Sequence, residues 1–260
     1  MEKLSAVIIS FNEEKNIERC IRSLDGVADE IVVFDSGSTD RTREICEKYG
    51  VTFFIHPFDG YIEQKNRALS HARFPLVLSL DADEALSDTL KASILSVKKQ
   101  RHADGYTMNR LTNYCGRWIR HCGWYPDKKL RLFDKRKGRW GGVNPHDRFE
   151  MEKGAVIHHL QGDILHYSYY SVRQHVLQME NFSTIAAQAK FKQGERACFF
   201  KTWLSPVFKF IKCYVLRRGF MEGPEGWKIC TLSAGESYKK YRKLSTLHHQ
   251  KKNEHRIKAS

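Results

Sequence analysis

A short apolar run that ends abruptly in acidic residues constrains this chain more than any other stretch. The segment Leu76 to Leu80 is rich in Val and Leu, and Asp81-Ala82-Asp83-Glu84 follows it at once. A run of this length and composition fits a strand that is buried on both faces. In α/β folds, ligands bind where such strands end. Asp81 and Asp83 are two residues apart, so on a continuing strand both carboxylates face the same side.

Two like charges on one side repel each other unless a cation lies between them. Hard oxygen ligands favour Mg²⁺ or Mn²⁺, and such ions usually bind substrate phosphates as well. The pair therefore indicates a metal–diphosphate site. The alternative, which applies to any isolated pair of this kind, is a solvated turn after a strand. The segments that precede the pair decide between the two interpretations.

Two earlier strands end in a similar way. The segment 4–10 reads as a buried strand, and the acidic segment 11–14 follows it, in which Asn12 is suited to cap a helix. The segment 30–34 reads as a second strand that runs into Asp35 and a hydroxyl-rich loop. Capping of the next helix explains the second half of that loop but not Asp35. Its carboxylate can accept a hydrogen bond from a nucleotide base or a ribose hydroxyl.

A third strand at 51–55 and a helix at 61–69 continue the alternation of strands and helices. This alternation predicts an α/β fold with a mostly parallel central sheet and helices on both faces. Neither a dinucleotide-binding GxGxxG nor a P-loop motif is present. Acidic and hydroxyl side chains would therefore hold a nucleotide. Lys65 is placed to meet its phosphates, although a lysine on a helix is more often simply solvated.

Four blocks of sequence, VIISFNE, VVFDSGSTD, QKN and LSLDADE, resemble the family 2 (GT-A fold) inverting glycosyltransferases in order and spacing. They cover roughly residues 4–86. The resemblance implies a GT-A domain that binds a nucleotide-diphosphate sugar, usually a UDP-sugar, together with Mg²⁺ or Mn²⁺. The donor-binding residues that it implies are Ser10, Asn12, Glu13, Asp35 (at the base), Lys65, Asp81 and Ala82, and the metal ligands are Asp83 and Asp81.

The second half resembles the lipopolysaccharide-core branch of the same family. A strand that contains R-L-F precedes a tryptophan and the pair His146-Asp147, where that branch places its catalytic base. The resemblance implies that Asp147 is this base and that His146 orients it or the acceptor. Asp stands here in place of the commoner Glu, and its side chain is one methylene shorter. The alternative is a loop aspartate paired with Arg148 or Arg131.

His166 lies in a histidine-rich segment, 157–169. A neutral imidazole is a credible ligand for Mn²⁺, and some GT-A enzymes use a histidine in this way. His166 is therefore a candidate third metal ligand. The alternative is a core or surface histidine without a ligand.

Most of the net charge lies near the C-terminus. Residues 199–260 carry 14 Lys and Arg against 4 Asp and Glu, so they account for +10 of the +14 of the chain. The segment 199–218 mixes large apolar residues with Lys and Arg and contains no acid. Such a composition is typical of an amphipathic helix in a membrane interface. The alternative is a helix that packs on the domain with its basic edge in solvent.

We therefore expect two parts. The first is a GT-A domain at 1–195, with a donor half at about 1–100 and an acceptor half at about 101–195. The second is a basic, amphipathic, membrane-associating appendage at 196–260. The N-terminus lacks the layout of a signal peptide, and no apolar run reaches the ~20 residues of a membrane span. We expect a cytoplasmic protein, peripheral on the inner face of an anionic membrane.

The predicted function is that of an inverting, metal-dependent hexosyltransferase. It would move a hexose, glucose first among the candidates, from a UDP-sugar to a glycolipid such as the inner core of lipopolysaccharide. One alternative is a nucleotidyltransferase, which also ends strands with acidic metal ligands. Another is a non-catalytic sugar- or nucleic-acid-binding protein. Nucleic acid is not an expected partner, because the basic charge is confined to the tail and no nucleic-acid-binding motif is visible.

Overall fold

The computed structural model describes residues 1–143 and 146–259, except the side chains of residues 143, 146, 199 and 252–259. The chain forms two compact units. One comprises Met1–Thr112 and Pro126–Ser168, and the other Asn113–Tyr125 and Tyr169–Ser260. The second unit thus starts ahead of residue 195, where the sequence analysis divides the chain.

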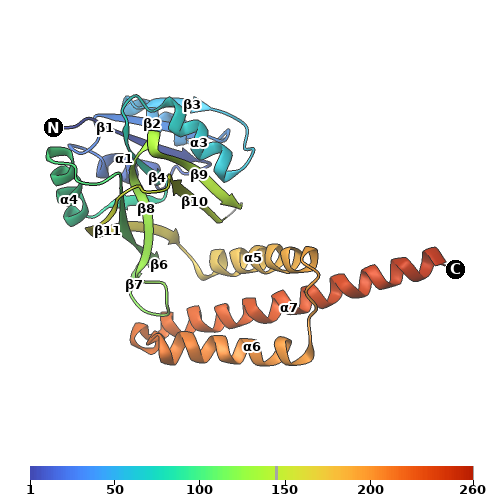
Figure 1. Ribbon diagram of the computed structural model, residues 1–260. Coiled ribbons are helices and arrows are strands. Elements are labelled where there is room, and N and C mark those ends of the chain that lie inside the picture. The colour runs from blue at the N-terminus through green and yellow to red at the C-terminus, as the bar shows by residue number, and fades with distance from the viewer. Residues whose placement is uncertain (144–145, 260) are drawn as a thin grey trace. The chain divides into compact units, whose positions relative to one another are not determined.

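Figure 1 shows the order of the elements along the chain. Those of the first unit are β1 (Leu4–Ser10), α1 (Ile17–Ser23), β2 (Glu30–Asp35), α2 (Thr42–Lys48), β3 (Thr52–Ile55), α3 (Tyr61–His71), β4 (Leu76–Asp81), β5 (Glu84–Leu86), α4 (Asp88–Lys99), β6 (Gly105–Tyr114), β8 (Asp127–Asp134), η1 (Lys135–Lys137), β9 (Gly138–Val143), β10 (His146–Met151) and β11 (Ile157–Tyr169). Those of the second unit are β7 (Arg117–Ile119), α5 (Val172–Lys192), α6 (Phe199–Ile211), the short π-helix η2 (Lys212–Leu216), η3 (Gly219–Glu222) and α7 (Gly223–Ala259).

The main sheet of the described residues has the strand order β3-β2-β1-β4-β8-β6-β11-β5. Strands β3, β2, β1 and β4 pair in parallel, as the sequence predicts, and β8 and β6 then join antiparallel. The register places Ser10 beside Asp35 and Ile9 beside Asp81. The polar ends of three neighbouring strands therefore meet at one edge of the sheet.

Helices cover both faces of this sheet (Figure 1). On one face, α1, α2 and α4 pack against the strands in a core that includes Leu78 and Ile94. On the other face, α3 packs through Ala68, and the β9–β10 hairpin packs through Trp140 and Phe149. Burial of each large side chain stabilises the fold by about 1.5–3 kcal/mol relative to exposure. The two cores fix α3 and the hairpin against the strands whose ends carry the acidic residues.

Asn12 does not cap a helix, so this prediction is wrong. Helix α1 begins at Ile17, and Asn16 occupies its N-cap position. Asn12 has a left-handed φ of 54°, and its Oδ1 accepts a hydrogen bond from the backbone N–H of Thr39 at 2.9 Å. The side chain thus joins the loop after β1 to the loop after β2.

The second unit is built on α7, which packs against both α5 and α6. Lys243 of α7 forms an ion pair with Glu180 of α5 at 2.9 Å. Tyr114, Trp124 and Tyr169 make ring contacts with one another in the same unit. Within the described residues, no helix combines the length and the apolar character needed to cross a bilayer.

Gly162 lets β11 pass close to the first turn of α4. Its φ is +99°, and a Cβ at this position would lie 2.4 Å from the backbone nitrogen of Leu90. Gly162→Ala should lower the free energy of unfolding by about 2–5 kcal/mol. A positive φ costs a non-glycine residue about 1–2 kcal/mol, and the steric overlap adds about 1–3 kcal/mol.

Gly154→Ala is the matched control for this change. Gly154 has a φ of +90°, but a Cβ there would have nothing within 4 Å. Only the backbone cost is expected, so the control should lose about 1–2 kcal/mol. Urea denaturation of both variants measures the difference, and equal losses would contradict the close approach of β11 to α4.

Candidate active site

Asp35 organises the loop that follows β2. Its carboxylate is buried and accepts hydrogen bonds from Ser10 Oγ at 2.7 Å and from Ser38 Oγ at 2.6 Å. It also accepts the backbone N–H groups of Gly37 at 2.9 Å and Ser38 at 2.6 Å. A carboxylate offers about four acceptor positions. Asp35 therefore shapes the loop that would contact the nucleotide base. Its four acceptor positions are all used within the protein, so in this arrangement none is left for the nucleotide base itself.

The Gln64-Lys65-Asn66 motif of α3 ties three separate segments together. The side-chain amide of Gln64 donates to Ser36 Oγ at 2.6 Å, in the loop after β2. The side chain of Asn66 exchanges hydrogen bonds with the backbone N–H and C=O of Trp140, at 3.0 and 2.9 Å. One turn of helix therefore fixes the loop after β2 and strand β9.

Lys65 lies between two carboxylates that are far apart in the sequence. Its Nζ is 3.0 Å from Asp81 Oδ1 and 2.7 Å from Asp147 Oδ2. Its side chain is only 5% exposed, and Nζ lies 4.6 Å from the centroid of the Trp140 ring. The structure thus brings the proposed base Asp147 next to the Asp81 end of β4, with Lys65 as the bridge.

Arg131 is the second buried cation of this site. Its Nη2 atom lies 2.6 Å from Asp81 Oδ2 and 3.1 Å from Glu84 Oε1. In the pairing of β8 with β6, Tyr106 faces Leu132 and Thr107 faces Leu130, so Arg131 is the extra residue of a β-bulge. Bulges re-aim side chains beside active sites, and this one turns Arg131 from the sheet toward the acidic end of β4.

These neighbours determine the ionisation of Asp81 and Arg131. Burial acts to raise the pKa of Asp81, but the charges of Arg131 and Lys65 outweigh it and hold that pKa well below its usual range. Burial acts to lower the pKa of Arg131, and the charges of Asp81 and Glu84 raise it further above its usual value. Asp81 and Arg131 therefore both stay charged at neutral pH.

Asp83 points to another partner than Asp81 does. Its Oδ2 lies 3.1 Å from Nε2 of His166. Burial acts to lower the pKa of His166, but the charge of Asp83 and their hydrogen bond raise it overall. A carboxylate oxygen and an imidazole nitrogen this close, both partly exposed, are a donor pair that suits Mn²⁺.

This pair could supply two ligands to a divalent cation and no more. Among the described residues, no group of three or more His, Cys, Asp or Glu side chains is arranged to hold a metal ion. Both oxygens of Asp81 are already engaged by Lys65 and Arg131. A cation at Asp83 and His166 would need further oxygen ligands, and Mg²⁺ and Mn²⁺ usually obtain these from water and substrate phosphates.

Glu13 lies on the same acidic edge. Its pKa is raised to about 7. Burial is the largest cause, the charges of Asp83, Asp40 and Asp81 act in the same direction, and a hydrogen bond from Asn16 acts against them. Its backbone N–H donates to Thr42 Oγ1 at 2.8 Å. Glu13 is thus a partly protonated carboxyl near neutral pH.

Two other predicted site residues, Ala82 and His146, have no described side-chain contact in the site. Ala82 is buried in the core on one face of the sheet, so its backbone alone is near the site. His146 pairs with Val143 through the backbone of the β9–β10 hairpin, but its side chain lies outside the described residues.

The central place of Arg131 and Glu84 is not predicted from the sequence. There, Arg131 is only an alternative partner of Asp147, and Glu84 is only part of an acidic segment. A signal was present, since Arg131 interrupts the apolar strand residues Leu130 and Leu132. A charged residue in a buried strand requires a charged partner.

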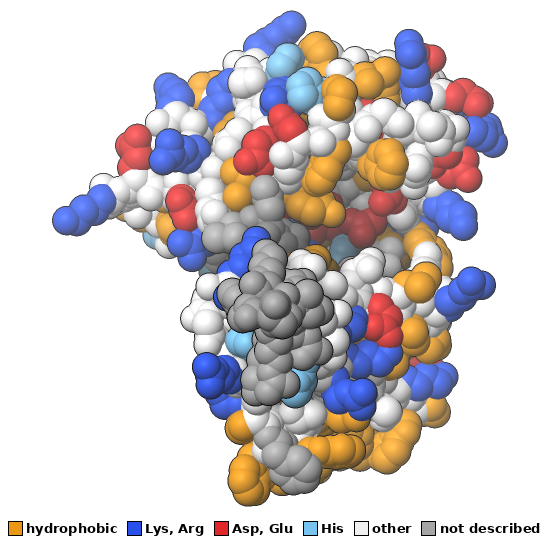
Figure 2. All heavy atoms as spheres, turned by 90° about the vertical axis from the view of Figure 1, so that its right-hand side faces the viewer, with side chains coloured by type: hydrophobic (Ala, Val, Ile, Leu, Met, Phe, Trp, Pro, Cys, Tyr) orange, Lys and Arg blue, Asp and Glu red, His pale blue; other side chains and the backbone are white. Residues whose placement is uncertain are grey.

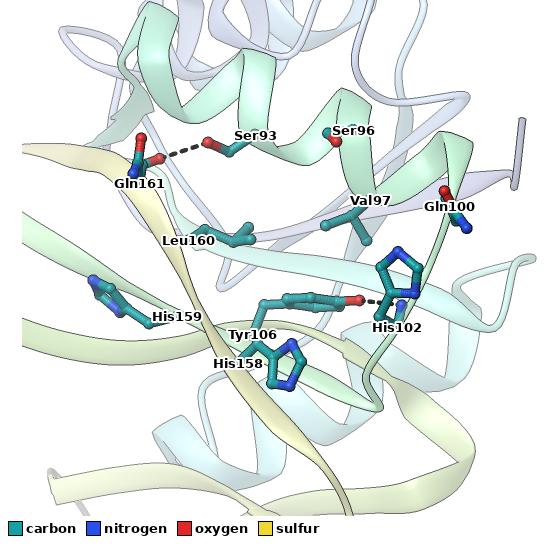
Figure 3. Close-up of a pocket in the computed structure, with 10 residues that line it drawn as sticks. All are labelled: Ser93, Ser96, Val97, Gln100, His102, Tyr106, His158, His159, Leu160 and Gln161. Carbon is teal, nitrogen blue, oxygen red and sulfur yellow. Dashed lines mark hydrogen bonds between the residues drawn. The ribbon is translucent and has the colours of Figure 1, made fainter.

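A cavity of about 300 Å³ lies elsewhere in the first unit, between α4 and β11 (Figure 3). The hydroxyl of Tyr106 accepts the backbone N–H of His102 at 3.0 Å inside it, and Ser93 donates to the carbonyl of Gln161 at 2.9 Å. The lining residues are Ser93, Ser96, Val97, Gln100, His102, Tyr106, His158, His159, Leu160 and Gln161. None is a carboxylate and none is a predicted site residue, so we place the reaction at the sheet edge.

The model of the family described as "Glycosyl transferase family 2" matches residues 5–157, more than half of the chain. This chain belongs to glycosyl transferase family 2. The lipopolysaccharide core biosynthesis glycosyltransferase LpsC of Rhizobium meliloti (strain 1021) is 28% identical over 256 residues, which cover 92% of this chain and 93% of LpsC. An uncharacterized glycosyltransferase of Rickettsia typhi is 30% identical over 257 residues, which cover 95% and 88% of the two chains.

Among solved structures, that of S. aureus TarS 1-349 in complex with UDP aligns with a TM-score of 0.45 and 17% identity, over 95% of this chain and 91% of that one. The family and the GT-A fold predicted from the four sequence blocks are confirmed. The protein is a glycosyltransferase, related to a lipopolysaccharide core enzyme.

The raised pKa of Glu13 predicts how stability depends on pH. Between pH 4.5 and about 7, the carboxyl is ionised in the unfolded chain and protonated in the folded one. Ionisation thus favours unfolding, and stability falls as pH rises through this range. The loss should be on the order of 1–3 kcal/mol. Glu13→Gln should remove it, so the variant gains stability relative to wild type between pH 5 and pH 8.

Urea denaturation at pH 5 and pH 8 measures this relative gain. Glu14→Gln is the control, because Glu14 is the exposed neighbour of Glu13. Its stability relative to wild type should change little with pH. If wild type and Glu13→Gln respond to pH in parallel, Glu13 is not held protonated in the folded chain.

Proposed function

We propose that this glycosyltransferase is inverting and metal-dependent and that it transfers a hexose, glucose first among the candidates, from a UDP-sugar. The acceptor that we propose is a glycolipid such as the inner core of lipopolysaccharide. The alignment with LpsC along nearly its whole length supports this acceptor class. Because the acceptor is lipid-linked, we place the enzyme in the cytoplasm, on the inner face of an anionic membrane.

The observation that carries the proposal is the Lys65 bridge. An inverting transfer needs a base beside the donor site, and Lys65 holds Asp147 next to Asp81, at the strand end where GT-A ligands bind. Asp83 comes two residues after Asp81 in the chain, and His166 of β11 lies 3.1 Å from it in the same unit. The proposed base, the two buried cations and the two proposed metal ligands therefore lie at one edge of the sheet.

Asp147 takes the proton in the proposed reaction. The acceptor oxygen forms a bond to the anomeric carbon as the bond between that carbon and the diphosphate oxygen breaks. UDP leaves with the bonding electron pair, and the hydroxyl proton passes to Asp147 Oδ1, because Oδ2 is held by Lys65 at 2.7 Å. A divalent cation at Asp83 and His166 would offset the charge that grows on the leaving diphosphate.

Thermal unfolding with UDP and Mn²⁺ tests the donor site. A ligand at about 100 times its Kd adds about 2.7 kcal/mol, which raises Tm by several degrees. We expect this rise with UDP plus Mn²⁺, a smaller one with UDP alone, and none with GDP, CMP or TDP. Asp83→Ala should abolish the Mn²⁺-dependent part, because it removes one of the two metal ligands.

Asp88→Ala is the control for Asp83→Ala, since Asp88 is a fully exposed aspartate at the start of α4. It should keep the full rise in Tm. A wild-type response to UDP and Mn²⁺ in Asp83→Ala would contradict the metal site.

Asp147→Asn separates donor binding from transfer. The variant keeps the shape of the side chain but cannot accept the proton, so transfer should fall by roughly 10²–10⁴-fold while the UDP-dependent rise in Tm persists. UDP release from UDP-glucose with a lipopolysaccharide core acceptor measures transfer. Asp59→Asn, at an aspartate paired with Arg67 outside the site, should transfer at the wild-type rate. Unchanged turnover in Asp147→Asn would exclude Asp147 as the base.

A further inference from the structure

Helix α6 exposes its apolar face instead of burying it. Six large apolar side chains recur at a spacing of three or four residues, which places them on one side of the helix. Their exposed fractions lie between 43% for Ile211 and 70% for Phe200. This α6 face comprises Phe200, Trp203, Leu204, Val207, Phe208 and Ile211.

The opposite side of α6 is the one that packs on α7. Phe210 lies there with its ring centroid 5.1 Å from that of Trp227 of α7, and its neighbours on this side are small or polar. Thr202, Ser205 and Pro206 are half-buried there, and Ser205 Oγ lies 2.8 Å from Ser237 Oγ of α7. A helix of a soluble domain ordinarily packs its apolar stripe inward. Trp203, at the edge of the α6 face, also contacts Tyr238 of α7, with ring centroids 5.4 Å apart. The α6 face nevertheless leaves large apolar side chains exposed to solvent.

Basic residues border the α6 face. Lys201, Lys209 and Lys212 are exposed on α6 and η2, as are Arg217 and Arg218 just beyond them. No Asp or Glu occurs between residues 199 and 221. The surface therefore attracts a partner that is apolar inside and negatively charged outside.

The apolar surface continues past the end of the helix. Val215, Leu216, Phe220 and Met221 are all more than half exposed. Figure 2 shows hydrophobic side chains gathered along the lower edge of the view, over α6. Exposed apolar side chains gathered in this way mark an interaction site rather than ordinary surface.

We propose that the α6 face docks on an anionic lipid bilayer, with α6 lying in the plane of the interface. Thirteen residues of helix span only about 20 Å, which is too short to cross a hydrocarbon core of about 30 Å. Trp and Phe beside Lys and Arg are the composition of interfacial helices. A second copy of the chain would bring like charges together. This proposal depends on the proposed function in one respect, namely that the acceptor is linked to a lipid.

Sedimentation of the full chain with vesicles tests the proposal. Binding to vesicles of phosphatidylethanolamine with about 30% phosphatidylglycerol should be at least 10-fold tighter than binding to phosphatidylcholine vesicles. The double variant Trp203→Ser/Phe208→Ser should bind the anionic vesicles at least 10-fold more weakly. Lys201→Gln/Lys209→Gln/Lys212→Gln should lose the preference for anionic lipid.

Leu177→Ser/Phe182→Ser is the matched control, because both residues are exposed apolar side chains on α5 of the same unit. It should bind vesicles as wild type does. Wild-type binding by Trp203→Ser/Phe208→Ser, or equal loss in the control, would overturn the proposal. The proposal would also be overturned if the wild-type protein does not bind vesicles but forms a dimer in sedimentation velocity, and the double variant does not form this dimer.

Vesicle binding can fail while the proposed function holds, and a measurement of UDP binding distinguishes the two cases. UDP with Mn²⁺ should raise the Tm of Trp203→Ser/Phe208→Ser as much as that of wild type, because the donor site lies in the other unit. A wild-type protein that responds to UDP but does not bind anionic vesicles would refute the docking surface alone.

Discussion

The buried ammonium of Lys65 is the interaction on which the rest of the site depends. Its positive charge attracts both Asp81 and Asp147, at 3.0 and 2.7 Å, and so allows two carboxylates from distant parts of the chain to lie close. Breaking a buried pair by removing one partner leaves an uncompensated charge, which is strongly destabilising. The position of α3 is therefore as important to the chemistry as the acidic strand end itself, and Gln64 and Asn66 fix that position.

A second constraint is the charge balance around Asp81. Lys65 and Arg131 together use both of its oxygens, and Glu84 shares Arg131. Asp81 therefore pairs with two cationic side chains of the protein, whereas Asp83, directed toward His166, is the metal ligand that we propose. Two aspartates with a single residue between them thus have different roles, because their neighbours differ. The β-bulge at Arg131 is what brings the second cation to this point.

The sequence predicts the parallel half of the sheet and the edge that carries the site, because buried strands and their acidic ends are local patterns. It also predicts that Lys65, Asp81 and Asp147 matter, through the family resemblance. It does not predict that Lys65 joins the other two, since this contact depends on how α3 and the β9–β10 hairpin pack. Asn12 illustrates the same limit, because its partner Thr39 lies across the sheet edge. The bulge at Arg131 requires the register of β8 against β6, which no single strand encodes.

The most direct test of the account is the position of manganese and nucleotide in a crystal of the protein grown with UDP and Mn²⁺. Anomalous scattering locates the metal without reference to a mechanism. The account predicts a manganese peak within coordination distance of Asp83 and His166, with the nucleotide along the ends of β1 and β2 and with Asp147 still near Lys65. A peak elsewhere, or a nucleotide in the cavity between α4 and β11, would contradict it.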